Sequence, residues 1–151
     1  MLQVVIDDAA LRTTALGLGV LTVRFLGTTF GSLAASLAEG AHPAEDQASV
    51  SALTSSQQNL KAGTSERYKR WQNVLRNDFE NLPLGLALMS MSLLAGADPT
   101  VHAAAVTAFV AGRVLFTPCY VFGLQPFRSI AYNVGLAGIL AFAYNVVSPH
   151  L

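Results

Sequence analysis

The sequence predicts an all-α integral membrane protein whose four spanning helices form an up-down-up-down bundle. Hydrophobic residues make up 52% of the 151-residue chain and charged residues only 12%, which is too apolar for an ordinary soluble domain of this length. Four segments are long and mainly apolar, and the connections after the second and third are short, so neighbouring helices should run antiparallel. We expect residues 1–151 to form a single transmembrane domain.

The first two spans are separated by a long polar connection. We expect the first span at about residues 11–37, interrupted only by Arg12 and Arg24, and the second at about residues 73–95. Residues 39–64 are rich in Ala, Ser and Gln and show no clear apolar period. Such a composition indicates a loop and not a second domain.

The last two spans are apolar segments joined by tight connections. They lie at about residues 101–122 and 127–147, each close to the 20 or so residues that a spanning helix needs. The lone Cys119 lies in the third span, where it packs as a small hydrophobic residue and cannot form a disulfide within the chain.

The charge distribution predicts how the bundle is oriented. Basic and acidic residues number nine each, so no nucleic-acid partner is expected. By the positive-inside rule, loop 39–64 faces the cytoplasm or the equivalent side of an organelle. We expect the membrane of the endoplasmic reticulum or of another organelle, mitochondria included. The basic residues on the loop side are Lys61, Arg67, Lys69, Arg70, Arg76 and Arg128.

The histidines do not predict a metal site. His42 lies in the loop, His102 opens the third span and His150 lies at the chain end. No two of them have metal-ligand spacing. We expect solvated or interfacial histidines and no bound metal.

Polar side chains form a stripe on one face of each of the last three spans. Residues three, four or seven positions apart share a helix face, and ionisable residues at membrane depth are usually functional. We expect the three stripes to share one polar site near the cytoplasmic end. They consist of Arg76, Asn77 and Glu80, then Arg113, Thr117 and Tyr120, then Arg128, Ser129 and Tyr132.

This set of groups favours a small, polar ligand that carries carboxylates and an amine. Guanidinium groups bind carboxylates in a bidentate fork, and Glu80 could receive an ammonium group. The Ser129 hydroxyl beside the charge of Arg128 would stabilise a thiolate. Arg113 lies about ten residues inside its span and needs an acidic partner, for which Glu80 is the best placed.

A purely structural interpretation of the same residues stays open on spacing alone. Arg76 and Asp78 could anchor the second span at the membrane interface. Arg113 and Glu80 could form an interhelical ion pair without any ligand. The tyrosines could belong to an aromatic belt.

Three motifs occur in order along the chain. They are the string RNDFEN at residues 76–81 followed by Leu82 and Pro83, then Gly112 and Arg113 followed by Thr117 and Tyr120, then Pro126, Phe127, Arg128 and Ser129 followed by Tyr132. Together they resemble the MAPEG family, the membrane-associated proteins of eicosanoid and glutathione metabolism. The resemblance covers nearly the whole chain, is strongest across residues 66–132, and extends to Arg24 and Asp46.

The resemblance implies a homotrimer of four-helix subunits with glutathione bound between neighbouring subunits near the cytoplasmic face. Arg113 resembles a structural arginine that pairs with the carboxylate at Glu80. Arg128 and Ser129 resemble positions beside the glutathione sulfur, and Asp46 is similar to an acidic position implicated in chemistry in one branch. The positions that resemble glutathione-binding residues are Arg76, Asn77, Glu80, Tyr120, Arg128, Ser129 and Tyr132.

The chain departs from the branch of the family close to prostaglandin synthase at three places. Residues 34–40 contain no Lys or Arg where that branch has a basic run. Phe116 stands in place of a histidine that faces glutathione, and Asn73 replaces an arginine. These departures predict weaker glutathione binding and argue against a prostaglandin substrate.

The function we expect is glutathione-dependent transfer or peroxide reduction on a lipophilic electrophile, with the thiolate stabilised by Arg128 and Ser129. The alternative is a catalytically inactive, MAPEG-like structural or accessory subunit of a larger membrane complex. The missing basic run and Phe116 favour the alternative, whereas retention of Arg128, Ser129 and Tyr132 favours the enzyme. A transporter or channel is disfavoured because the chain has no internal repeat.

Overall fold

The computed structural model describes residues 6–39, 66–96 and 98–150, and all regular structure in those ranges is helical. The prediction of an all-α fold is therefore confirmed for this part of the chain. Asp46 and the rest of the expected loop from residue 40 onward lie outside the described residues. The elements are α1 (Asp8–Glu39), α3 (Glu66–Leu94), α4 (Pro99–Val121), α5 (Phe127–Val147) and the short 3-10 turn η2 (Ser148–His150).

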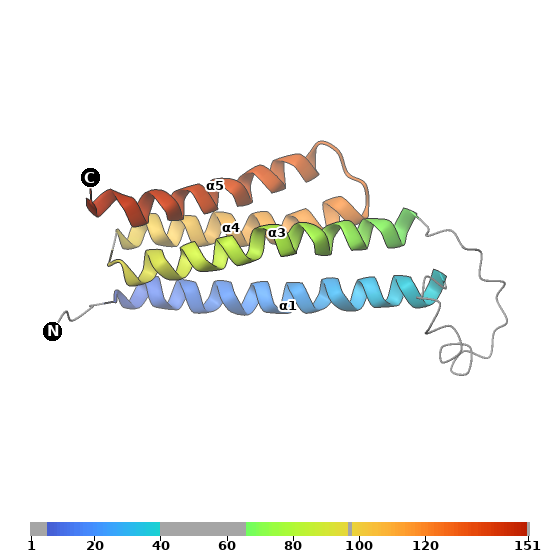
Figure 1. Ribbon diagram of the computed structural model, residues 1–151, viewed down its shortest axis with the longest axis horizontal. Helices are drawn as coiled ribbons and strands as arrows, with labels where there is room; N and C mark the ends of the chain where they lie inside the picture. The colour runs from blue at the N-terminus through green and yellow to red at the C-terminus, as the bar shows by residue number, and fades with distance from the viewer. Residues whose placement is uncertain (1–5, 40–65, 97, 151) are drawn as a thin grey trace.

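The four long helices lie side by side, and each runs opposite to the one before it (Figure 1). The end of α1 meets the start of α3, where the Gln72 amide donates to Ser32 Oγ at 2.9 Å. At the opposite end, His102 near the start of α4 contacts Thr14 near the start of α1. The same ring contacts Ser92 near the end of α3.

Three of the described helices are long and apolar enough to cross a membrane, namely α1, α4 and α5. Helix α3 lacks a comparably apolar stretch because its first half carries most of its charges. It begins at Glu66, seven residues before the span that the sequence predicts there. The protein is an integral membrane protein, and α3 is the helix least suited to face lipid.

Both ends of α4 are set by local sequence. Asp98 caps its start, because Oδ1 accepts hydrogen bonds from the backbone N–H of Thr100 at 2.8 Å and of Val101 at 3.2 Å, and Pro99 takes the first helical position. At the other end Gly123 adopts φ +69°. The Leu124 N–H donates to the Cys119 carbonyl across this turn at 2.8 Å, which closes the helix in the manner of a Schellman motif.

Glycines let α4 and α5 approach each other closely. A Cβ added to Gly112 would collide with the backbone of Gly135. A Cβ on Gly138 would stand 2.6 Å from the backbone nitrogen of Phe109. Close packing of helix backbones at small residues is a general way of joining helices in lipid. The core cluster that contains Phe109 also holds the large buried side chains of Met89 and Phe142.

Candidate functional site

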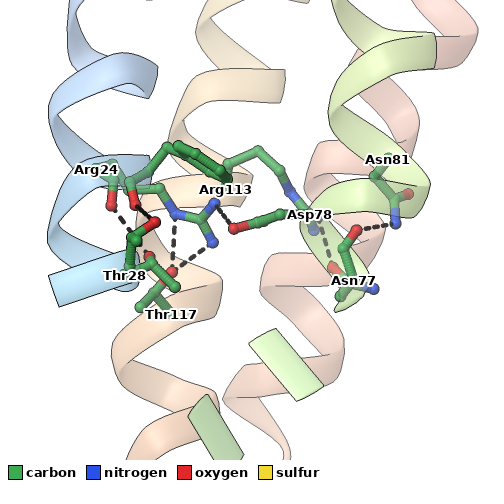
Figure 2. Close-up of polar contacts among 9 residues, drawn as sticks. Arg24, Thr28, Asn77, Asp78, Asn81, Arg113 and Thr117 are labelled. Carbon is green, nitrogen blue, oxygen red and sulfur yellow. Dashed lines mark hydrogen bonds and ion pairs between the residues drawn. The ribbon is translucent and has the colours of Figure 1, made fainter. Parts of the chain in front are cut away.

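A buried polar layer crosses the bundle at mid-height. Arg24 of α1 points inward, and its Nη1 lies 2.5 Å from Oδ2 of Asp78 on α3 (Figure 2). Arg24 Nε also donates to Thr117 Oγ1 on α4 at 2.8 Å. The Arg24 and Asp78 side chains are only 7% and 0% exposed. Charges this deep in a membrane helix are expensive unless they are paired. Arg24 thus links α1 to α3 and α4, and its partner Asp78 is not an interfacial anchor.

Arg113 belongs to the same layer but has a partner that the sequence did not predict. Its side chain is buried, and Nη1 donates to Asn77 Oδ1 at 2.7 Å (Figure 2). The expected ion pair between Arg113 and Glu80 does not form within the subunit. Glu80 follows Asp78 by two positions, so it lies about 200° around the helix from the buried face. It contacts Arg76 instead, with Oε1 3.3 Å from Nε.

Aromatic rings connect Arg113 to Arg128. The Arg113 guanidinium carbon lies 4.9 Å from the ring centre of Phe116 and 5.8 Å from that of Tyr132. Phe116 packs in turn against Tyr120, with ring centres 5.4 Å apart. The Arg128 guanidinium carbon is 4.7 Å from the ring centre of Tyr120. Four of the predicted site residues therefore form a continuous arginine–aromatic array with Phe116, namely Arg113, Tyr120, Arg128 and Tyr132.

Stacking on an aromatic ring fixes a guanidinium without using its hydrogen-bond donors. Arg128 can therefore be held in place by Tyr120 and still present N–H groups to a ligand. Ser129, the next residue, is exposed, and its Oγ lies 3.4 Å from the side-chain amide of Gln125. Gln125 also reaches Arg128, because its amide oxygen, when turned toward the guanidinium, accepts from Nε at 3.2 Å.

A polar cavity of about 310 Å³ opens beside Tyr120 and Arg128. It lies between the start of α3, the end of α4 and the start of α5. Its walls include three cationic side chains and one carboxylate, so the cavity suits an anionic group. The lining residues are Glu66, Lys69, Arg70, Asn73, Tyr120, Gly123 and Arg128.

Two predicted site residues point away from the arginine–aromatic array. The side chains of Arg76 and Glu80 are 81% and 59% exposed within the subunit, and they contact each other along one face of α3. Asn77 is half-buried between this pair and Arg113. The single subunit thus brings together Asn77, Tyr120, Arg128, Tyr132 and the neighbouring Ser129, and leaves Arg76 and Glu80 on an outer face.

A second buried polar network lies at the other end of the bundle. The expectation of a solvated or interfacial His102 is wrong, because the ring is buried. Its Nε2 lies 2.7 Å from Thr14 Oγ1 and its Nδ1 2.9 Å from Ser92 Oγ. Asn145 donates to the same serine at 2.9 Å and to the Asp98 carbonyl at 3.2 Å. Polar residues within apolar segments predict that each has a hydrogen-bonding partner, but the sequence does not identify the partner.

One of two comparisons with known proteins assigns the chain to a family. A model of the MAPEG family matches residues 14–148. That range includes all of α3, α4 and α5, most of α1, the arginine–aromatic array and the polar cavity. No curated protein matches the sequence.

Proposed function

Because the chain belongs to the MAPEG family, we propose that it is a glutathione-dependent transferase or peroxidase acting on a lipophilic electrophile in the membrane. The observation that carries this proposal is the placement of Arg128 over Tyr120, beside Ser129 and at the edge of a cationic cavity. A guanidinium and a hydroxyl at one point are suited to stabilising a thiolate.

In the proposed reaction Arg128 and Ser129 hold the sulfur of glutathione as a thiolate. In transfer, the thiolate forms a bond to an electrophilic carbon, and the bond from that carbon to its leaving group breaks. In peroxide reduction, the thiolate attacks the terminal oxygen of the hydroperoxide, the O–O bond breaks, and the departing alkoxide takes up the proton that the thiol gave up and leaves as an alcohol. A second glutathione then converts the resulting sulfenic acid to the disulfide and water.

The remaining site residues would hold the tripeptide. Guanidinium groups and tyrosine hydroxyls donate to its carboxylates and carbonyls, and Glu80 accepts from its ammonium group. Asn77 has its carbonyl oxygen occupied by Arg113, which leaves the amide N–H₂ group of Asn77 to donate to the ligand. The residues assigned to this role are Arg76, Asn77, Glu80, Tyr120 and Tyr132.

We also propose that the functional unit is a homotrimer. Helix α3 is too polar to face lipid, and the exposed pair of Arg76 and Glu80 lies on it beside Phe79, which is also exposed. Covering this face with other copies of the chain would remove the charged pair from hydrocarbon. A ligand bound at that interface would contact Arg76 and Glu80 in addition to the cavity. The positive-inside rule then places the connection between α1 and α3 on the cytoplasmic or equivalent side.

Calorimetry and an activity screen test this function. We expect the detergent-solubilised protein to bind glutathione and to turn over an aryl halide or a lipid hydroperoxide. Arg128→Ala should lower kcat/KM by about 10²- to 10³-fold, as expected when a donor to the developing anion is lost. Arg12→Ala is the matched control, because Arg12 is exposed at the start of α1, far along the helix from the cavity. Wild-type protein that neither binds glutathione nor turns over either substrate contradicts the proposal.

One observation favours the alternative, a catalytically inactive accessory subunit of a larger membrane complex. Phe116 is buried between Arg113 and the rings of Tyr120 and Tyr132, so this position offers a ligand no hydrogen bond. The accessory role predicts that partners of fixed stoichiometry copurify with the protein from native membranes. It also predicts no heat of glutathione binding.

A further inference from the structure

The buried polar network at the end of the bundle opposite Arg128 contains a titratable ring that the proposed function does not use. His102 of α4 is only 1% exposed. Its Nε2 lies 2.7 Å from Thr14 Oγ1 on α1, and its Nδ1 lies 2.9 Å from Ser92 Oγ on α3. The ring also packs against Phe142 of α5, with ring centres 5.8 Å apart. All four long helices therefore meet at this one ring.

Counting hydrogen-bond donors shows which ring nitrogen carries the hydrogen. A hydroxyl has one proton to donate, and Thr14 donates its proton to the Ala10 carbonyl at 2.8 Å. Thr14 Oγ1 must therefore accept from His102, so Nε2 carries a hydrogen. Ser92 Oγ accepts from the Asn145 amide at 2.9 Å, which leaves the serine proton for Nδ1. A neutral ring thus satisfies both contacts, with Nε2 as donor and Nδ1 as acceptor.

A second proton on the ring would break this arrangement on the side of α3. Nδ1 would then present a hydrogen to Ser92, whose oxygen already accepts from Asn145, and the serine proton would lose its acceptor. No ion pair found among the described residues involves His102, so the imidazolium would be a buried cation without a partner. Burying an unpaired charge or an unsatisfied donor destabilises a fold.

A small polar cavity of about 120 Å³ gives protons access to the ring. Ser92 and His102 form its buried walls, and its exposed rim is formed by Asp7, Gly96 and Pro99. The cavity therefore connects the ring to the surface at the end of the bundle that lies across the membrane from the connection between α1 and α3.

Asp7 is the charged residue that lines this cavity. Its Oδ1 caps α1 by accepting from the Ala10 N–H at 2.9 Å, and its other oxygen is left for a cation. The nearby Asp98 is engaged at the start of α4, where it accepts from two backbone N–H groups. Residues 81–94 of α3 and 129–147 of α5 contain no charged side chain. Asp7 is thus the carboxylate available to a protonated ring.

We propose that His102 is a pH-sensitive switch at this end of the bundle. The neutral ring joins α1, α3 and α4 through Thr14 and Ser92. A proton that enters through the cavity breaks the contact with Ser92, and the resulting imidazolium turns toward the carboxylate of Asp7. Free imidazole is half protonated at about pH 6.5. The network is therefore closed above about pH 7 and opens as the pH falls, because the unfolded chain takes up a proton that the closed network excludes.

Thermal unfolding of the full-length protein in detergent at about pH 8 and about pH 5 tests this switch. His102→Gln is the informative variant, because a glutamine amide offers both a donor and an acceptor but does not take up a proton. Between the two pH values, the melting temperature of wild type should fall by about 3–10 °C more than that of His102→Gln, as expected for the loss of one buried polar contact. An equal fall in both proteins overturns the proposal.

Asp7→Asn tests the partner of the protonated ring, because asparagine also caps a helix but carries no charge. It should enlarge the fall in melting temperature at low pH. Asp8→Asn is the matched control, because Asp8 is the next residue and does not line the cavity. Equal falls in these two variants contradict the assigned partner.

Nitrogen NMR of wild type labelled at histidine provides a readout that does not depend on the folding of a variant. The His102 ring should carry a hydrogen on Nε2 alone at about pH 8 and on both nitrogens at about pH 5. A ring that stays neutral at the lower pH, or that carries its hydrogen on Nδ1 at the higher pH, overturns the proposal.

Discussion

At the scale of single residues, the protein's organisation depends on charges that are buried and paired. Arg24 and Asp78 lie at mid-height in the bundle with almost no exposed surface. Thr117 and Asn77 accept from the two guanidiniums of this layer. Removing one partner of a buried pair leaves the other charged and unpaired, which costs far more than the pair itself contributes.

We therefore predict that Asp78→Asn lowers the free energy of unfolding by about 3–5 kcal/mol. The double variant Arg24→Met with Asp78→Leu should recover part of this loss, because it removes both charges of the pair and leaves only Arg113 charged in the layer. Glu66→Gln serves as the control, since its exposed pair with Lys69 should contribute about 1 kcal/mol or less. Reversible unfolding in detergent measures all of these variants. Equal stability of Asp78→Asn and Glu66→Gln would contradict the assigned burial.

At the scale of elements, helix packing is decided by small residues at the seam between α4 and α5. Gly112 and Gly135 meet backbone to backbone, and Gly138 meets Phe109. The aromatic core packs beside this seam, with the rings of Phe109 and Phe142 6.2 Å apart. The seam also fixes how far α5 lies from α4, and hence the distance from Arg128 to Tyr120.

Gly112→Ala should therefore destabilise the bundle, by about 1–3 kcal/mol, because the added methyl group overpacks the seam. It should also weaken any function that needs Arg128 beside Tyr120. Gly19→Ala is the matched control, because a Cβ on Gly19 meets nothing within 4 Å. Alanine there should be neutral or stabilise α1 by up to about 1 kcal/mol. Thermal unfolding measures the stability of both variants. A Gly112→Ala variant more stable than Gly19→Ala would be inconsistent with the packing described.

At the scale of the whole molecule, the four long helices differ in whether their exposed surfaces are suited to contact lipid. Helices α1, α4 and α5 are apolar enough for lipid, whereas α3 carries exposed charges together with exposed apolar residues such as Phe79 and Leu84. The difference predicts that α3 lies at an interface between copies and that α1 presents an outer face to the bilayer.

Cysteine crosslinking tests this arrangement. In a Cys119→Ser background, Leu84→Cys on α3 should form crosslinks between subunits in native membranes. Val23→Cys on α1 is the control, because its side chain is also exposed in the subunit but should face lipid. Native mass spectrometry should give three copies per particle. Crosslinking at residue 23 and none at residue 84 would show that the wrong helix has been assigned to the interface.

The sequence predicted much of the fold and part of the candidate site. The expected spans at residues 101–122 and 127–147 lie within two residues of α4 and α5 at each end, because long apolar segments and glycine or proline turns are local signals. The predicted span began at residue 73 and α3 begins at Glu66, since the charged first turns of this helix have no apolar signature. The polar stripes on α4 and α5 predicted Tyr120 and Arg128 as residues of one site, and the structure places the Arg128 guanidinium over the Tyr120 ring.

The amino-acid sequence alone determined the helical class, the membrane setting, the MAPEG motifs and the face on which each polar residue lies. Only the tertiary structure decided which of those faces meet. Helical periodicity gives the angle of a side chain around the axis of its own helix. Which residue it contacts depends on the rotation and the axial offset of the neighbouring helix. Arg113 therefore meets Asn77 and not Glu80, Arg24 meets Asp78, and His102 lies buried between Thr14 and Ser92.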